Sequence, residues 1–190
     1  MYYKYMTDTV KNKKKEVSEQ MGRRIIYVLL HNIRSSHNVG SVFRTSDAFG
    51  ISHIAISGYT PAPVDRFGKV NDTLVKVALG AEGTVSWKKY SGPAIALREF
   101  KRKFPAGKVV ALEQSKKAVL LGSSEMMARL GGQNVPVLLI LGNEVEGVSS
   151  TLLRKADLIV EIAQVADGTK ESLNVSVATG VALYELGSLL

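Results

Sequence analysis

The chain has 190 residues, 45% hydrophobic and 22% charged, which is typical of an ordinary globular domain with a core of its own. It carries a net charge of +8 and no cysteine, and its three histidines have no carboxylates at ligand spacing, so disulfides and thiolate sites are excluded and we expect no metal. The polar N-terminus lacks a secretory signal and no apolar run approaches the roughly 20 residues that span a bilayer, so we expect a cytoplasmic protein without membrane contact.

The first 24 residues form the most basic part of the chain. They hold seven Lys and Arg against three acids, which is half of the net charge. A basic excess fits a polyanionic partner such as RNA, because each cation that meets a phosphate releases a counterion. By itself such a run is more typical of a solvated arm. We therefore interpret 1–24 as a basic N-terminal extension and 25–190 as one domain.

After residue 24, short β-branched runs alternate with helical patterns. Strands are expected at 25–30, 53–57, 85–90, 108–113, 135–141 and 158–162. Helices are expected at 38–50, 93–104, 149–156 and 172–190, whereas 115–132 is ambiguous. This alternation predicts a single α/β domain, a parallel sheet with helices on both faces.

Three loops follow predicted strands and carry an unusual set of polar residues. They are SSHNVGSVFRT (35–45), GNEVEG (142–147) and AQVADGTKESLN (163–174). Binding sites of open parallel sheets lie at the carboxyl ends of the strands. These loops are therefore the candidate functional segments.

The first loop opens an amphipathic helix. At 100° per residue, its apolar residues fall on one side and Arg44 falls almost opposite. Gly40 lies one turn before Arg44, on what we expect to be an open side, where a glycine lets a phosphate or ribose approach the helix start. Asn38 either caps the helix or turns its amide outward. The alternative is purely structural, with Asn38 only capping the helix and Arg44 only pairing with Asp47.

The other two loops are also open to two interpretations. Gly142 and Gly147 permit close backbone approach to a ligand, while Glu144 would repel phosphates and favour a ribose, a neutral base edge or a cationic sulfonium. The loop matches neither G-x-G-x-x-G nor the P-loop, and a plain turn is the alternative. In the last loop we expect Ser172 to cap the closing helix and Asn174, in its first turn, to point back at the loop; plain capping is the alternative.

Taken together, the order and spacing of these motifs resemble one family. N-x-G-x-x-x-R-T at 38–45, L-G-N-E-V-E-G-V-S at 141–149 and S-L-N-V-S-V-A at 172–178 are similar to the three motifs of the SpoU/TrmH branch of the SPOUT RNA methyltransferases. The stretches GYTPAP (58–63), ALGAE (78–82) and ALE (111–113) also look like that family. The resemblance covers nearly everything from Arg24 to Leu186.

The resemblance implies a fold and a cofactor. The family's α/β sheet has a C-terminal segment threaded into a deep trefoil knot, which forms the pocket for S-adenosylmethionine. By this resemblance, the residues that bind the cofactor are Leu112, Glu113, Gly142, Ile162 and Leu173.

The implied reaction is methyl transfer to a ribose 2′-hydroxyl of RNA. A guanidinium is a poor base, so we assign Arg44 to stabilising the developing alkoxide beside a phosphate. Asn38 would orient Arg44 or the ribose, and Glu144 would hold the guanidinium or polar substrate groups. Ser172 and Asn174 would fix the ribose and the cofactor loop.

The family also implies partners. Its members work as homodimers on structured RNA, for which we favour tRNA over rRNA, and the segment from Lys4 to Arg24 would take the place of a separate RNA-binding domain. One departure is clear: relatives usually carry Pro-Met and a shorter loop after the residue matching Ile162, whereas this chain has Ala163, Gln164 and VADGTK. The alternatives are a non-catalytic RNA-binding protein on the same scaffold and a doubly wound enzyme acting on small nucleotides.

Overall fold

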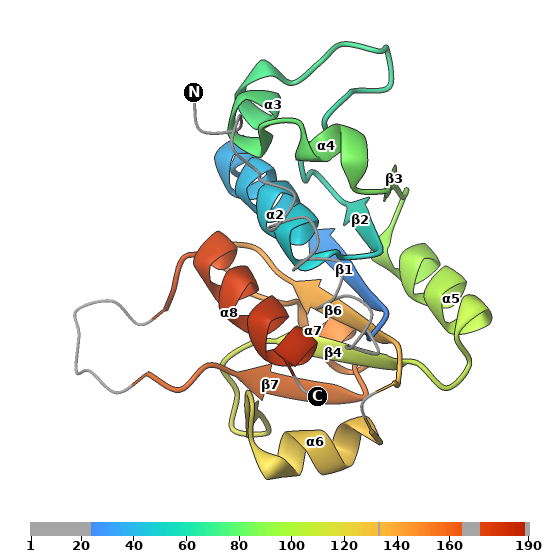
Figure 1. Ribbon diagram of the computed structural model, residues 1–190, viewed down its shortest axis with the longest axis vertical. Coiled ribbons are helices and arrows are strands. Elements are labelled where there is room, and N and C mark those ends of the chain that lie inside the picture. The colour runs from blue at the N-terminus through green and yellow to red at the C-terminus, as the bar shows by residue number, and fades with distance from the viewer. Residues whose placement is uncertain (1–23, 133, 165–171, 189–190) are drawn as a thin grey trace, which may run out of the picture.

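The computed structural model describes residues 24–132, 134–164 and 172–188, and the strands in these ranges form one parallel sheet (Figure 1). The strands are β1 (Ile26–His31), β2 (His53–Ser57), β3 (Trp87–Lys89), β4 (Lys108–Leu112), β5 (Val119–Leu120), β6 (Val137–Leu141) and β7 (Leu158–Glu161). They lie in the order β3-β2-β1-β6-β4-β7-β5, and every neighbouring pair is parallel. The predicted parallel α/β domain is confirmed.

Helices cover both faces of the sheet. They are α2 (Ser36–Phe49), α3 (Asp72–Ala78), α4 (Ala81–Thr84), α5 (Pro93–Lys103), α6 (Ser124–Leu130), α7 (Ser150–Leu153) and α8 (Val175–Ser188). Side chains alternate along each strand, so Val28 and Leu30 of β1 join the core beneath α2 and α8, whereas Leu29 joins the core beneath α5 and α7. No helix in the described ranges is both long and apolar enough to cross a membrane.

The ambiguous segment 115–132 contains the edge strand β5 and helix α6. The predicted basic extension lies outside the described residues except for Arg24, whose guanidinium donates a hydrogen bond to the carbonyl of Gly132 (2.8 Å). Its interpretation as an RNA-binding arm stays a prediction.

Strand β7 lies between β4 and β5, which are joined only by residues 113–118. The N–H of Glu113 donates to the carbonyl of Val160 (3.0 Å), and the N–H of Leu121 donates to the carbonyl of Glu161 (2.8 Å). The connection therefore arches across the carboxyl end of β7, and we call it the 113–118 arch. The chain that leaves β7 emerges directly at this arch.

Gly40 lies in the contact between α2 and α3. A Cβ at Gly40 would lie 2.6 Å from the carbonyl oxygen of Leu74 and 2.9 Å from the Cβ of Val77. The expectation that Gly40 opens a path for a ligand is therefore wrong. Periodicity gives the angle of a residue around its helix, but it does not show which neighbouring helix covers that side.

We expect Gly40→Ala to destabilise the protein. Alanine favours helix, but its Cβ meets the backbone of α3, and overpacking of this kind costs about 1–3 kcal/mol of the free energy of unfolding. Gly83→Ala in α4 is the matched control, because nothing lies within 4 Å of a Cβ there, and it should be neutral or stabilising by up to about 1 kcal/mol. Urea unfolding measures both, and equal stabilisation by the two variants would contradict this packing.

Candidate active site

A pocket of about 660 Å³ lies at the carboxyl ends of β4, β6 and β7, within the range typical of small-molecule sites. All five residues predicted to bind the cofactor line it: Leu112, Glu113, Gly142, Ile162 and Leu173. Glu144, Ser172 and Asn174 line it as well. The ends of β4, β6 and β7 and the chain around the start of α8 thus meet at one place.

The loop after β6 folds tightly on itself. The N–H of Asn143 donates to the carbonyl of Gly147 (3.0 Å), and the N–H of Gly147 donates back to the carbonyl of Asn143 (2.9 Å). A Cβ at Gly142 would lie 2.2 Å from the backbone of Gly147, so only glycine fits there. Glu113 ties this loop to β4, because its carboxylate accepts a hydrogen bond from the N–H of Val148 (2.5 Å).

Asn143 holds the loop in shape, and the sequence analysis did not single it out. Its Nδ2 donates to the carbonyl of Asn32 (2.9 Å) and to the hydroxyl of Tyr59 (2.8 Å). Its Oδ1 accepts from the N–H groups of Val145 (2.7 Å) and Glu146 (2.8 Å). The residue is only 7% exposed. The available signal was an Asn at the start of a turn, where its side chain accepts from N–H groups two and three residues later.

Glu144 fastens the start of α2 to the same loop. Its carboxylate accepts hydrogen bonds from the N–H groups of Arg34 (2.9 Å) and Ser35 (3.2 Å) and from the side-chain amide of Asn38 (2.9 Å). Burial alone would raise the pKa of Glu144, but these donors stabilise the charged form and hold the pKa below its ordinary value. In the described chain Glu144 thus binds the N-terminus of α2, and no ion pair joins it to Arg44.

Asn38 and Asn174 join the first and third motifs. Nδ2 of Asn174 donates to Oδ1 of Asn38 (3.2 Å), so a hydrogen-bonded chain runs from Asn174 through Asn38 to Glu144. Ser35 caps α2, so the side-chain amide of Asn38 is not needed as the cap and makes these two hydrogen bonds instead. Asn174 caps α8, because its carbonyl accepts from the N–H of Ala178 and its Oδ1 from the N–H of Ser176.

The expectation that Ser172 caps α8 is wrong. Helix α8 begins at Val175, three residues after Ser172, so the backbone geometry gives the cap to Asn174. Ser172 is exposed and lines the pocket instead.

Arg44 does not reach the pocket of its own chain. It is exposed on α2, as predicted, and makes no hydrogen bond or ion pair to any other residue that the structure describes. Its suggested partner Asp47 accepts a hydrogen bond from the hydroxyl of Thr84 (2.7 Å). Arg44 follows Asn38 by six residues. At about 100° per residue, this separation places the two side chains on different sides of the helix.

The pocket is acidic although the chain is basic. Its described lining includes Glu113, Glu144, Glu146 and Glu161 and holds no Lys, Arg or His. Such a lining repels phosphates and favours a cation. Among the described residues, no group of three or more His, Asp or Glu could hold a metal ion.

The sequence profile of the SpoU rRNA Methylase family matches residues 25–184. The chain belongs to this family. This SpoU-family chain is 31% identical over 171 residues to the tRNA (guanosine(18)-2'-O)-methyltransferase of Aquifex aeolicus, covering 90% of the chain and 72% of the relative. It is 33% identical over 162 residues to the 23S rRNA (guanosine-2'-O-)-methyltransferase RlmB of Ralstonia nicotianae, covering 84% of the chain and 57% of that relative.

Solved structures agree with this assignment. The TrmH/SpoU tRNA modifying enzyme of A. aeolicus superposes with a TM-score of 0.69 at 28% identity, over 95% of this chain and 84% of that one. An AdoMet-bound rRNA methyltransferase from Sinorhizobium meliloti superposes with a TM-score of 0.70 at 27% identity, over 86% of this chain and 56% of that one. At the level of the family, the expected RNA methyltransferase that uses S-adenosylmethionine is confirmed.

The residues of the SpoU-family pocket fit S-adenosylmethionine. The four carboxylates suit the positively charged sulfonium and disfavour phosphorylated nucleotides. Leu112, Ile162 and Leu173 supply apolar surface for a base, and Asn174 and Ser172 offer polar groups to a ribose.

We expect Asn143→Asp to weaken S-adenosylmethionine binding by at least about tenfold and to lower the free energy of unfolding by about 1–3 kcal/mol. The substitution places a carboxylate oxygen against the carbonyl of Asn32, where an N–H donor stood. Asn71→Asp is the matched control, since Asp caps a helix as well as Asn does and Asn71 caps α3. Calorimetric titration and urea unfolding measure these effects, and undiminished binding by Asn143→Asp would contradict the role of Asn143.

Glu144→Gln should destabilise the protein at neutral pH, because the new amide group opposes backbone N–H donors. Since the folded pKa of Glu144 lies below its ordinary value of 4.5, its stabilisation is complete above that pH and is lost as the pH falls through the folded pKa. The difference between wild type and variant should therefore shrink as the pH falls below 4.5 and through the lower folded pKa of Glu144. Glu146→Gln removes the same charge, but the Glu146 side chain accepts none of these hydrogen bonds. Equal destabilisation by the two variants would refute the role of Glu144 in binding the start of α2.

Proposed function

We propose that this chain transfers the methyl group of S-adenosylmethionine to a ribose 2′-hydroxyl of a structured RNA, with tRNA favoured over rRNA. The observation that carries the proposal is the acidic pocket at which residues of all three family motifs are joined by hydrogen bonds. The names of the Aquifex and Ralstonia relatives support ribose methylation and include one tRNA and one rRNA enzyme.

S-adenosylmethionine supplies a methyl group on a sulfonium, which is already a good leaving group. As the methyl group passes to the ribose oxygen, the sulfonium becomes a neutral thioether and the hydroxyl proton is released to water. The protein therefore has to orient the hydroxyl and stabilise the charge that develops on its oxygen. We assign the stabilisation of this charge to the cationic guanidinium of Arg44, which also binds an adjacent phosphate. Asn38, Glu144 and Asn174 hold the start of α2, and with it Arg44, in a fixed orientation.

We propose that the active form is a homodimer. Helix α8 exposes Val177, Val181 and Tyr184, and the ring of Tyr184 contacts the exposed Phe49 of α2 edge-on (6.4 Å between centroids). A contiguous apolar surface of this kind favours association with a second copy. Because Arg44 is exposed and does not line the pocket of its own chain, we assign it to RNA bound across the subunit boundary.

We also propose that the C-terminal segment is threaded into a trefoil knot. The strand order supports this proposal, because the chain that leaves β7 emerges at the 113–118 arch and then returns to α8 beside α2. The expected knot would make this arch part of the wall that holds the cofactor.

Arg44→Ala should lower methyl transfer to RNA by at least about 100-fold while leaving S-adenosylmethionine binding unchanged, because the guanidinium acts on the developing charge and not on the donor. Transfer of labelled methyl groups to separate tRNA and rRNA fractions measures the effect, and ribose-methyl mapping identifies the nucleotide. Arg98→Ala, an exposed arginine on the opposite face of the sheet, is the control of equal charge.

Two results would overturn parts of this proposal. Undiminished transfer by Arg44→Ala would remove Arg44 from the mechanism. A wild-type protein that binds RNA and S-adenosylmethionine but transfers no methyl group would be the non-catalytic RNA-binding protein on the same scaffold.

A further inference from the structure

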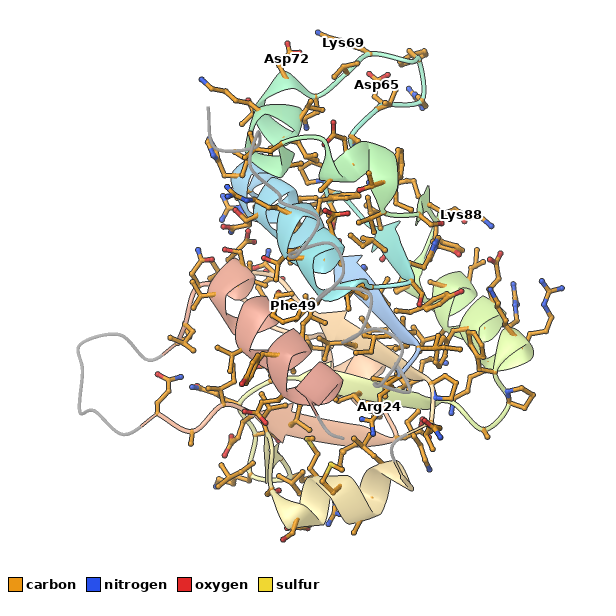
Figure 2. All side chains as sticks on the ribbon, viewed as in Figure 1. Arg24, Phe49, Asp65, Lys69, Asp72 and Lys88 are labelled. Carbon is orange, nitrogen blue, oxygen red and sulfur yellow. The ribbon has the colours of Figure 1, made fainter. Side chains whose placement is uncertain are left out.

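Between β2 and α3 the chain forms a projecting hairpin, residues 63–71, which we call the 63–71 hairpin (Figure 1). Val64 and Val70 form an antiparallel bridge, and the N–H of Asn71 donates to the carbonyl of Pro63 (2.9 Å). In Figure 2, Asp65 and Lys69 lie in the part of this loop that extends beyond the helices. The hairpin is therefore an ordered projection.

A defined turn closes the tip. The N–H of Asp65 donates to the carbonyl of Lys69 (2.9 Å), and the N–H of Gly68 donates to the carbonyl of Asp65 (3.1 Å). Gly68 has φ +82°, so the tip has the arrangement of a three-residue hairpin loop closed by a left-handed glycine. The carboxylate of Asp65 accepts from the N–H groups of Phe67 (2.8 Å) and Lys69 (2.9 Å). The carboxylate of Asp65 thus fixes the tip from within.

The tip presents an aromatic ring flanked by cations. Phe67 is 80% exposed, more than any other large apolar side chain that the structure describes. The guanidinium of Arg66 lies 4.7 Å from the centroid of the Phe67 ring. Arg66 and Lys69 form no ion pair within the described chain, whereas the one acid of the tip is occupied by backbone N–H groups. The tip therefore offers an aromatic ring and two cations that form no ion pair in the described chain, although both interact electrostatically with the neighbouring Asp65.

The hairpin follows the carboxyl end of β2, and the loop of Gly142 to Gly147 follows the carboxyl end of β6. Both strands are parallel members of one sheet and therefore end at the same edge, while in Figure 1 the hairpin lies at the α3 end of the molecule and β4 and β7 lie toward the other end. A large substrate whose target nucleotide reaches the pocket can also extend to the hairpin.

We propose that the 63–71 hairpin is a second RNA contact, in which an unpaired base stacks on Phe67 while Arg66 and Lys69 bind neighbouring phosphates. This inference rests on the proposed function. Aromatic and arginine planes are the groups on which proteins stack unpaired bases, and two cations without an ion-pair partner favour a polyanion over an apolar protein partner. A rigid turn lowers the ordering entropy that such a contact would otherwise cost.

Substitutions of Phe67 test the stacking. Phe67→Ala and Phe67→Leu should each raise the Kd for unfractionated tRNA by about 5- to 100-fold, since leucine is apolar but has no ring face. Phe67→Trp should bind at least as tightly as wild type, and its added tryptophan fluorescence should be quenched by tRNA. Leu120→Ala, which alters a 49% exposed side chain on β5, is the control and should bind tRNA normally. Unchanged S-adenosylmethionine affinity shows that each variant is folded.

Substitutions of Asp65 separate the shape of the tip from its charge. Asp65→Asn keeps the acceptor oxygen and removes a negative charge, so it should bind tRNA as tightly as wild type or more tightly. Asp65→Ala removes the same charge together with the acceptor, and it should bind more weakly. Electrostatics alone predicts that both variants bind more tightly, and this outcome would overturn the role of the ordered turn.

The outcomes distinguish this inference from the proposed function. If wild type methylates and binds tRNA or rRNA but Phe67→Ala and Phe67→Leu do so equally well, the hairpin contact is refuted and the proposed function stands. If Phe67→Leu binds as wild type does and only Phe67→Ala is weak, the contact is apolar and is not base stacking. If wild type neither binds nor methylates any RNA, both proposals fail.

Discussion

The pocket at the carboxyl ends of β4, β6 and β7 depends on two side chains that accept hydrogen bonds from backbone N–H groups. Asn143 and Glu144, adjacent in the loop after β6, accept hydrogen bonds from that loop and from the start of α2. Both segments are irregular there, and their N–H groups need partners that a sheet or helix would otherwise provide. The two residues thus make the end of one strand and the beginning of a distant helix a single rigid unit.

The distribution of charge differs between the chain as a whole and the pocket. The chain as a whole carries +8, yet the described lining of the pocket contains four glutamates and no basic residue. Under the proposed function, basic outer surfaces attract the RNA backbone, whereas the acidic pocket disfavours its phosphates and accepts the sulfonium of the methyl donor. The same polyanion therefore does not compete for the cofactor site.

The fold was largely predictable because it depends on patterns of hydrophobicity along the chain. Alternating strand and helix patterns predicted a parallel sheet covered on both faces, whereas the segment that contains the short strand β5 stayed ambiguous because the two residues of this strand carry too weak a pattern. Gly40 and Ser172 were assigned wrongly for another reason. Helix α3 covers Gly40, and the position at which the backbone first becomes helical decides which residue caps α8. The local sequence predicts neither feature.

The sequence by itself determined the residue types of the site and their order, because the family motifs around Asn38, Glu144 and Asn174 can be read directly. Only the tertiary structure decided how they act together. Hydrogen bonds between residues more than one hundred positions apart turn three ambiguous loops into one connected site, and they give Asn143 an importance that no local pattern indicates. Such bonds depend on the order of strands in the sheet, which periodicity along the chain does not encode.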